Sequence, residues 1–368
     1  MKTTAAVLRG VGGKWEVEEV ELDPPGPGEV LIELVASGLC HSDEHMVTGD
    51  LPVAFPVIGG HEGAGRVLEI GPGVTDVVTG DPVVTTFLPS CGRCSYCVRG
   101  HTALCDDGAG AMLGPQLDGT YRFHARGEDL GQMCLLGTFA RHTVVPVKSV
   151  VKIDEGIPLE LAALVGCGVT TGVGSAIRAA ELHPGDTAVV IGIGGIGANA
   201  VQGAKLAGCR YVMAVDPVEF KREKALELGA THVAASMDDA WQRVSELTRG
   251  RLADAAILTT GVAEGSYLQP ALQLVGKRGR VVVTALGHPS EDMASLSLLE
   301  LTLYEKQIRG SLFGSSNAQH DVPRLLELYQ LGQLKLAELV TRTYALEEIN
   351  TGYQDMREGR NIRGVIHY

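Results

Sequence analysis

Positive charge is scarce in this sequence, which has 31 lysines and arginines against 44 aspartates and glutamates and a formal net charge of −13. Nucleic acids and anionic membranes bind basic surfaces, so neither is an expected partner. Long hydrophobic runs are missing as well, since no uninterrupted apolar stretch approaches the ~20 residues of a membrane helix. The first residues, MKTTAAVL, carry no signal-peptide pattern. We therefore expect a cytoplasmic protein that acts on small molecules.

The chain also lacks internal repeats and low-complexity tracts, and its 368 residues suffice for about two domains. Residues 1–150 consist of short apolar runs between glycine and proline turns, which predicts a barrel or sandwich of strands. From residue 187, short strands alternate with helices, which is typical of a parallel sheet buried on both faces. Residues 320–368 are expected to rejoin the first domain. In the second domain we expect strands at 187–193, 211–216, 232–235, 255–260, 280–286 and 307–313, and helices at 195–207, 219–228, 238–248 and 265–275.

A glycine-rich turn follows the first of these strands, with the sequence Gly192-Ile193-Gly194-Gly195-Ile196-Gly197. The first glycine permits a tight turn, the second lets the backbone approach a pyrophosphate, and the third lets the helix pack on the strand. Asp216 ends the second strand about 20 residues later, where a carboxylate bonds the ribose hydroxyls and repels a 2′-phosphate. The pattern predicts NAD rather than NADP, and a helix-capping role for Asp216 is the alternative.

Four of the eight cysteines, Cys91, Cys94, Cys97 and Cys105, lie in one short segment. In a reducing cytoplasm, clustered cysteines bind metals more often than they form disulfides. Four thiolates close a tetrahedron around Zn²⁺ and leave no open position, so such a site is structural. An iron–sulfur cluster is the alternative.

Other metal-capable side chains are scattered along the chain, at Cys40, His61 and Cys167. Two sulfurs and one imidazole form a donor set that some catalytic zinc sites use, with the fourth position left for water or substrate. A lone cysteine is usually a small buried hydrophobe. Spacing alone therefore does not join these three segments.

With these motifs the sequence resembles the zinc-containing medium-chain dehydrogenase/reductase family, specifically alcohol dehydrogenases, over essentially the whole chain. The shared motifs are GHEGAG at 60–65, the four-cysteine lobe at 91–105, GCGVTTG at 166–172 and GIGGIG at 192–197. The resemblance implies an α/β fold with two domains. A GroES-like β-rich catalytic domain, residues 1–168 and 315–368, would accompany a Rossmann domain with a doubly wound parallel sheet, residues 169–314.

The resemblance also assigns the metal site. It implies that Cys40, His61 and Cys167 bind a catalytic zinc, so that each chain holds two zinc ions. Glu62 would lie beneath that metal, and Asp43 would be the acid that orients the histidine ligand.

The remaining site residues are assigned by the same resemblance. Ser42 matches the hydroxyl that takes the alcohol proton, His45 matches the end of the relay to solvent, and Leu51 and Phe87 match the walls of the substrate pocket. For the cofactor, His41 replaces a phosphate-binding arginine of many members, while Arg363 matches a pyrophosphate arginine. The other cofactor residues implied are the glycine motif with Asp216, the adenosine-ribose residue Lys221, and Thr171 and Ile196 about the nicotinamide.

A closer resemblance is to the actinobacterial alcohol dehydrogenases that work with an artificial nitroso dye or mycofactocin, through the stretches 59–63, 121–124, 133–139 and 306–314. In that group NAD stays bound and a second carrier reoxidises it. Ala109 stands where the glutathione-dependent formaldehyde branch has an arginine, which argues against that substrate.

The expected function is reversible hydride transfer between NAD and a primary or secondary, apolar alcohol. The resemblance implies a homo-oligomer, with a dimer through residues 307–313 favoured and a trimer or tetramer as the alternatives. An aldehyde reductase of a biosynthetic pathway would need the same residues and is one alternative. A non-catalytic nucleotide-binding relative is the other, but its signature would be the loss of zinc ligands, and all three are present.

Overall fold

The computed structural model describes residues 1–290 and 293–368 and divides the chain into two compact units. Unit 1 comprises Met1–Cys167 and Asn317–Tyr368, and unit 2 comprises Gly168–Ser316. These divisions differ by one and two residues from the boundaries expected at 168 and 314.

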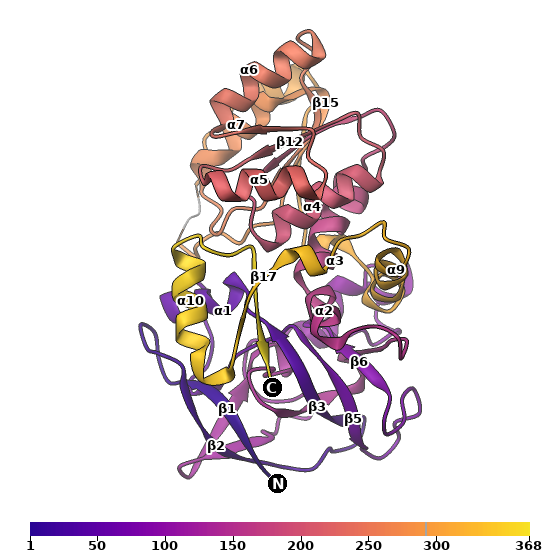
Figure 1. The fold of residues 1–368 in the computed structure, drawn as a ribbon, viewed down its shortest axis with the longest axis vertical. Helices are drawn as coiled ribbons and strands as arrows, with labels where there is room; N and C mark the ends of the chain where they lie inside the picture. Colours follow the sequence, from indigo (N-terminus) through magenta and orange to yellow (C-terminus); the bar gives the residue numbers. More distant parts are fainter. Residues whose placement is uncertain (291–292) are drawn as a thin grey trace. The chain divides into compact units, whose positions relative to one another are not determined.

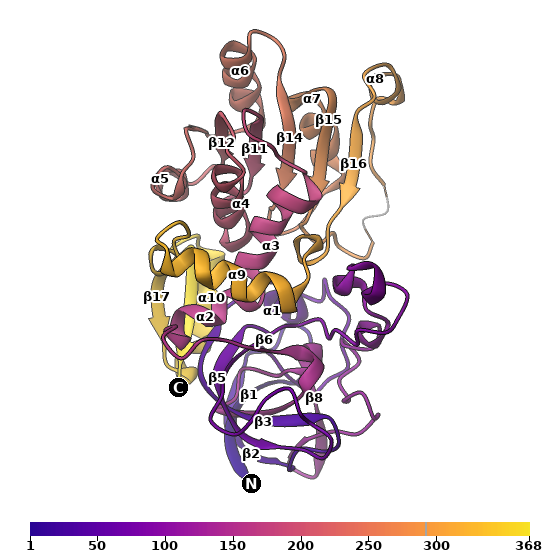
Figure 2. The same ribbon diagram turned by 90° about the vertical axis from the view of Figure 1, so that its right-hand side faces the viewer.

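Unit 2 contains a six-stranded parallel sheet in the order β13-β12-β11-β14-β15-β16 (Figure 2). Helices α6 and α7 pack on one face of the sheet, where Val244 and Leu272 join a core with Val189 and Met213. Helix α4 packs on the other face together with α3. The doubly wound sheet is thereby confirmed. Its strands are β11 (Thr187–Ile191), β12 (Tyr211–Val215), β13 (His232–Ala234), β14 (Ala253–Leu258), β15 (Val275–Val283) and β16 (Gln307–Gly310), and its helices are α3 (Gly168–Gly174), α4 (Gly195–Leu206), α5 (Glu219–Leu228), α6 (Met237–Thr248), α7 (Leu268–Leu274) and α8 (Leu298–Leu303).

Two strands differ from their expected bounds by three to five residues, and the other four by at most two. β15 starts at Val275 and ends at Val283 rather than covering 280–286. Its ladder with β14 closes there, because the N–H groups of Thr284 and Ala285 both donate to the Leu258 carbonyl, at 3.1 and 3.2 Å. β16 ends at Gly310 rather than 313, since Phe313 has a φ of 54° and turns the chain into a 3-10 turn.

Unit 1 combines a closed barrel, β1-β2-β7-β8-β4, with a seven-stranded sheet in the order β10-β6-β5-β3-β18-β17, in which β9 also pairs with β3. Figure 1 shows the yellow C-terminal segment beside the N-terminal part of the chain, where Val365 of β18 pairs with Gly38 of β3. The C-terminal tail therefore rejoins the first domain, as expected. The strands are β1 (Lys2–Leu8), β2 (Glu16–Leu22), β3 (Glu29–Gly38), β4 (Val57–Ile58), β5 (Gly63–Ile70), β6 (Pro82–Thr85), β7 (Phe123–Ala125), β8 (Glu128–Gln132), β9 (His142–Pro146), β10 (Val150–Lys152), β17 (Val340–Tyr344) and β18 (Arg363–His367), and the helices are α1 (His41–Thr48), α2 (Leu159–Ala162), α9 (Ala318–Gln330) and α10 (Ile349–Arg357).

Among the described residues, no single helix has the length and apolar composition needed to cross a membrane. One bent pair, Leu159–Gly166 with Gly168–Ala179, satisfies those two criteria together, at an angle of 52°.

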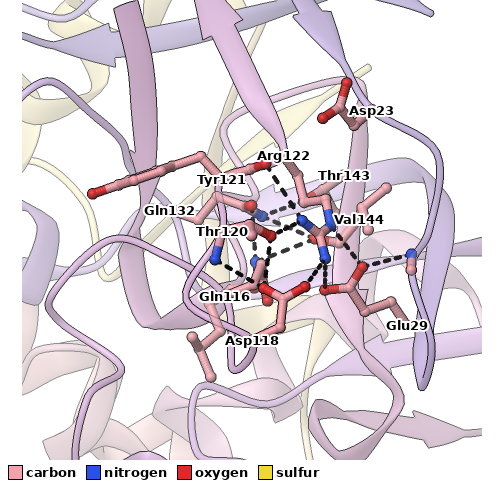
Figure 3. Close-up of polar contacts among 12 residues, drawn as sticks. Asp23, Glu29, Gln116, Asp118, Thr120, Tyr121, Arg122, Gln132, Thr143 and Val144 are labelled. Carbon is pink, nitrogen blue, oxygen red and sulfur yellow. Dashed lines mark hydrogen bonds and ion pairs between the residues drawn. The ribbon is translucent and has the colours of Figure 1, made fainter.

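An ion network fixes the loop before β7 to strand β3 (Figure 3). Arg122 donates to both carboxylate oxygens of Glu29, at 2.7 and 3.0 Å, and to Asp118 at 2.6 Å. Arg122 and Glu29 are almost fully buried, whereas Asp118 is half-exposed. Burial alone would raise the pKa of Asp118, but hydrogen bonds from Thr120 and Arg122 outweigh it and lower the pKa to about 2.

We expect Arg122→Met to destabilise the protein by about 3–5 kcal/mol, because it leaves the Glu29 carboxylate buried without its partner. Thermal unfolding at neutral pH measures this loss. Arg126→Met is the matched control, since Arg126 pairs with Glu16 and Glu18 but is 53% exposed, and it is expected to cost at most about 1 kcal/mol. Equal losses in the two variants would contradict the assignment of Arg122 as the anchor of this loop.

Candidate functional site

Cys40 lies where strand β3 leads into helix α1. It is the N-cap of α1 in an extended conformation, with φ −121° and ψ 153°, and it is 5% exposed. The neighbouring Leu39 donates its N–H to the Gly364 carbonyl at 2.9 Å, which ties this segment to the C-terminal strand. The Ser42 hydroxyl lies 3.7 Å from the Cys40 sulfur. The helix start thus places a thiol and a hydroxyl together.

His61 lies in the glycine-rich loop between β4 and β5. Only glycine fits at Gly59, because a Cβ there would lie 2.3 Å from the Trp15 ring. Gly60 has a φ of 86° and donates its N–H to Asp43 Oδ1 at 2.7 Å. The other Asp43 oxygen lies 3.4 Å from His61 Nδ1. Because Nδ1 faces this carboxylate, Nε2 is the ring nitrogen left for a metal.

The three predicted catalytic ligands meet within unit 1. One ligand atom each of Cys40, His61, Cys167 and the adjacent Glu62 all lie within 4.8 Å of one another, and all four residues are buried. Zinc bonds of about 2.0–2.3 Å place neighbouring tetrahedral ligands roughly 3–4 Å apart. The residues therefore fit a single zinc ion, with two thiols, an imidazole and a carboxyl as candidate donors.

Buried charges surround this donor set. Arg363 Nη2 contacts Glu62 Oε2 in an ion pair whose side chains are 5% and 0% exposed. Burial raises the pKa of Glu62 to about 7, although Arg363 opposes the shift. The pKa of Cys40 is lowered well below its ordinary value, chiefly by a hydrogen bond with the Cys167 thiol. Of the two thiols, Cys40 is therefore the more acidic.

Arg363 was expected to bind the pyrophosphate of the cofactor. In unit 1 its guanidinium lies against Glu62, and a Cβ at Gly38 would collide with both side chains. The contact with Glu62 had no sequence signal, since 301 residues separate the two positions. The role of Arg363 towards the nucleotide stays a prediction.

The four-cysteine lobe converges as well. The sulfurs of Cys91, Cys94, Cys97 and Cys105 lie within 4.8 Å of one another, and none forms a disulfide. The N–H groups of Cys94, Cys97 and Cys91 donate to the sulfurs of Cys91, Cys94 and Cys105, at 3.3, 3.4 and 3.3 Å. Hydrogen bonds from the backbone of Asp106 and Cys97 lower the pKa of Cys94 to about 6. The lobe thus presents four sulfurs in the arrangement of a closed metal site.

Of the two expected pocket residues, Phe87 contacts a candidate zinc ligand and Leu51 lies in the same apolar cluster as Phe87. The Phe87 ring meets the His61 ring edge to face at 5.7 Å, and Leu51 packs on the same apolar cluster as Phe87. Two further members of this cluster, Met112 and Cys134, have sulfurs 3.5 Å apart. Sequence reasoning missed both, because an isolated methionine and an isolated cysteine have no spacing that ties them to a site.

Ser42 and His45 lie three residues apart on α1 and therefore on one side of the helix. His45 Nδ1 lies 2.9 Å from Asp50 Oδ2, and its ring lies 5.0 Å from the His41 ring. Asp50 was not among the expected site residues. The glycine before it, which ends α1, is the signal that could have indicated a turn back towards the helix.

The glycine motif of unit 2 has the geometry expected of a nucleotide turn. Gly192 has a φ of 90°, and a Cβ there would lie 2.9 Å from the backbone of Thr260. Gly194 is the N-cap of α4, and a Cβ there would meet nothing within 4 Å, so this side of the turn is open. A Cβ at Gly197 would lie 1.9 Å from the Gly192 carbonyl oxygen. The open helix N-terminus can accept a phosphate group.

Asp216 follows β12 next to this turn. Its carboxylate accepts the N–H groups of Ile193 at 2.7 Å and of Val218 at 2.9 Å. The bond to Ile193 fixes the acid at the glycine turn. The bond to Val218 does not cap α5, because Val218 is itself the N-cap residue and this helix has no side-chain cap hydrogen bond among the described residues. Lys221 lies on α5. The Thr171 hydroxyl on α3 is buried, with no hydrogen-bond partner in the part of the chain that the structure describes.

Two family models match the chain. Residues 26–155 match the alcohol dehydrogenase GroES-like domain, and residues 195–330 match the zinc-binding dehydrogenase domain. The chain is 55% identical to the NDMA-dependent alcohol dehydrogenase of Amycolatopsis methanolica over 366 residues, which cover 100% of this chain and 99% of the relative.

Solved structures agree with these matches. An alcohol dehydrogenase zinc-binding domain protein from Burkholderia ambifaria superposes with a TM-score of 0.94 at 33% identity, and benzyl alcohol dehydrogenase from Acinetobacter calcoaceticus with 0.92 at 31%. In both cases the match covers 100% of this chain and 99% of the other. The relatives are named alcohol dehydrogenases, and the three residues expected to bind the catalytic zinc come together, so a non-catalytic role is not favoured. The chain belongs to the zinc-dependent alcohol dehydrogenases of the medium-chain dehydrogenase/reductase family and is an oxidoreductase.

Proposed function

We propose that this enzyme oxidises an apolar primary or secondary alcohol with NAD that stays bound between turnovers and is reoxidised by an external carrier such as mycofactocin. The observation that carries the proposal is the buried set of Cys40, His61 and Cys167, in a chain 55% identical to an NDMA-dependent alcohol dehydrogenase. That relative's name refers to an artificial electron acceptor, which supports recycling of the nucleotide in place.

Different residues of unit 1 are proposed to bind the metal, transfer the proton and balance the charge. A zinc ion at Cys40, His61 and Cys167 would supply a Lewis acid that lowers the pKa of an alcohol hydroxyl. Asp43 holds the His61 ring through Nδ1, and Ser42 lies beside the thiol ligand to take the alcohol proton. His45 passes that proton to solvent. Glu62, paired with Arg363, keeps a carboxyl next to the ligands without adding a net negative charge.

The pocket wall favours an apolar substrate. Phe87, Leu51, Met112 and Cys134 present aromatic, aliphatic and sulfur surfaces near the ligands, and such surfaces gain free energy by burying hydrocarbon. An aldehyde reductase would use the same wall in the reverse direction. The name of the Acinetobacter relative, benzyl alcohol dehydrogenase, supports an alcohol of this apolar kind.

NAD is proposed over NADP because of Asp216. Its carboxylate is 5% exposed and held at the glycine turn, where it would bond ribose hydroxyls and repel a 2′-phosphate. His41, Thr171, Ile196, Lys221 and Arg363 keep the cofactor contacts assigned to them by resemblance. NAD supplies the hydride acceptor when bound.

The four-cysteine lobe is proposed to hold a second, structural zinc ion, so that each chain carries two. We also propose a dimer through β16, which forms one edge of the described sheet. Near that edge Leu298 and Leu299 of α8 are each 70% exposed and Leu303 is 66% exposed, an apolar surface that a second copy of the chain would cover. A cytoplasmic location agrees with eight cysteines that are all free.

Mass spectrometry of the purified, denatured enzyme tests the proposal. We expect about one NAD and no NADP per chain, and much faster alcohol oxidation with a nitroso-dye acceptor than with free NAD. The comparison uses one enzyme preparation, so its zinc content is the same in both assays. Protein that purifies without nucleotide and turns over with free NAD would overturn bound-cofactor recycling, while leaving alcohol oxidation in place.

A further inference from the structure

We infer that Asp50 is a positioning residue that holds His45 in the tautomer able to accept a proton at Nε2. The inference rests on the proposed proton relay and deepens it. It begins from the contact between His45 Nδ1 and Asp50 Oδ2, at 2.9 Å, in which the two side chains are 5% and 21% exposed.

The end of helix α1 creates this contact. Gly49 takes the left-handed conformation, with a φ of 86°, which a side-chain-bearing residue rarely adopts. The N–H groups of Gly49 and Leu51 both donate to the His45 carbonyl, each at 3.0 Å. The chain therefore folds back on the last turn of α1 and brings the Asp50 carboxylate against the imidazole.

A second donor fixes the carboxylate. The Thr48 hydroxyl donates to the same Asp50 oxygen at 2.6 Å. An ionised carboxylate only accepts hydrogen bonds, so His45 Nδ1 must carry the hydrogen that it shares with Asp50. In the neutral ring, Nε2 is then the unprotonated nitrogen.

The proton balance follows from that tautomer. Nε2 accepts the proton that Ser42 has taken from the alcohol, while Nδ1–H stays donated to Asp50, whose negative charge stabilises the imidazolium. Nε2 then releases the proton to water, and the ring returns to its starting tautomer. Among neighbouring groups, the His41 ring lies 5.0 Å away, and Glu44 pairs with Arg357 of α10 at 2.6 Å.

Helix stability does not explain an acid at this position. The C-terminal end of a helix carries a partial negative charge, so Asp50 costs stability there instead of adding it. The hydrogen bonds with His45 and Thr48 offset this cost.

A double-mutant cycle tests the inference, with the hydride step followed as single-turnover reduction of bound NAD by alcohol. We expect Asp50→Asn to slow this step roughly tenfold to a hundredfold, because a relay residue contributes at least that much, with little change in KM. In a His45→Gln background the same substitution should have no further effect. Asp129→Asn is the control, since Asp129 makes a similar contact with His124, at 2.8 Å, on the exposed surface.

The outcomes separate the two proposals. The positioning role alone would be overturned if Asp50→Asn lowered the single-turnover rate equally in both backgrounds. It would also be overturned if His45→Gln lowered the rate and Asp50→Asn did not. If His45→Gln leaves both the single-turnover rate and its pH profile unchanged, the relay itself is wrong. Should Asp50→Asn not fold, Thr48→Val frees the carboxylate to turn, and its smaller loss of rate should also vanish in the His45→Gln background.

Discussion

Cys40→Ala is expected to remove one of the two zinc ions proposed for each chain and to lower alcohol oxidation on the order of 10³–10⁵-fold, because a Lewis acid contributes several kcal/mol to such a reaction. Cys40 is one of the four residues whose ligand atoms lie within 4.8 Å of one another in unit 1, and the hydrogen bond with the Cys167 thiol lowers its pKa. Elemental analysis of the purified variant gives the zinc count, and the oxidation rate is measured on the same sample.

Cys209→Ala is the matched control for that experiment. Cys209 is also free and partly buried, but it belongs to neither group of candidate ligands in the described residues. It should keep both ions and full activity. A Cys40→Ala enzyme with an unchanged zinc count and rate would remove the basis for the catalytic site.

The second large effect is expected at the four-cysteine lobe. Cys97→Ala removes one of four sulfurs from a closed site, and such sites contribute roughly 10–16 kcal/mol to folding in small zinc domains. We expect the other zinc ion to be lost, residues 91–105 to become sensitive to protease, and the unfolding temperature to fall. Limited proteolysis with peptide mapping measures this, together with elemental analysis.

The same samples decide between the two metals considered for the lobe. Wild-type protein that is colourless and holds two zinc ions agrees with a structural zinc, whereas iron with visible absorbance indicates a cluster. Serine at Cys134, a buried cysteine outside the lobe, is a control that should leave the protease pattern unchanged. Loss of protection around residue 97 in that control would assign the effect to general destabilisation.

Most features that depend on a local sequence pattern could be predicted from the sequence. The strands and helices of unit 2 were predictable from hydrophobic periodicity. The glycine turn was predictable from its three glycines, because Gly192 and Gly197 leave no room for a side chain and Gly194 leaves the start of α4 open. The four lobe cysteines lie close together in the chain, so their spacing alone indicated a metal site.

Contacts between residues far apart in the sequence could not be predicted from local sequence patterns. Cys40, His61 and Cys167 were joined only by family resemblance, because no local period relates segments so far apart. The Glu62–Arg363 pair and the Met112–Cys134 contact were missed for the same reason. Asp50 lies only five residues from His45, yet its role depends on the positive φ of Gly49, which returns the chain to the helix.

The discontinuous course of unit 1 has a consequence for biosynthesis. Strand β18 pairs with β3 next to the segment that carries Cys40, and it supplies the arginine that faces Glu62. This strand is synthesised after all of unit 2, whose residues Gly168–Ser316 form one continuous segment. The four residues that could hold the metal all precede unit 2 in the chain, so the arginine that faces Glu62 joins them only after unit 2 has been synthesised.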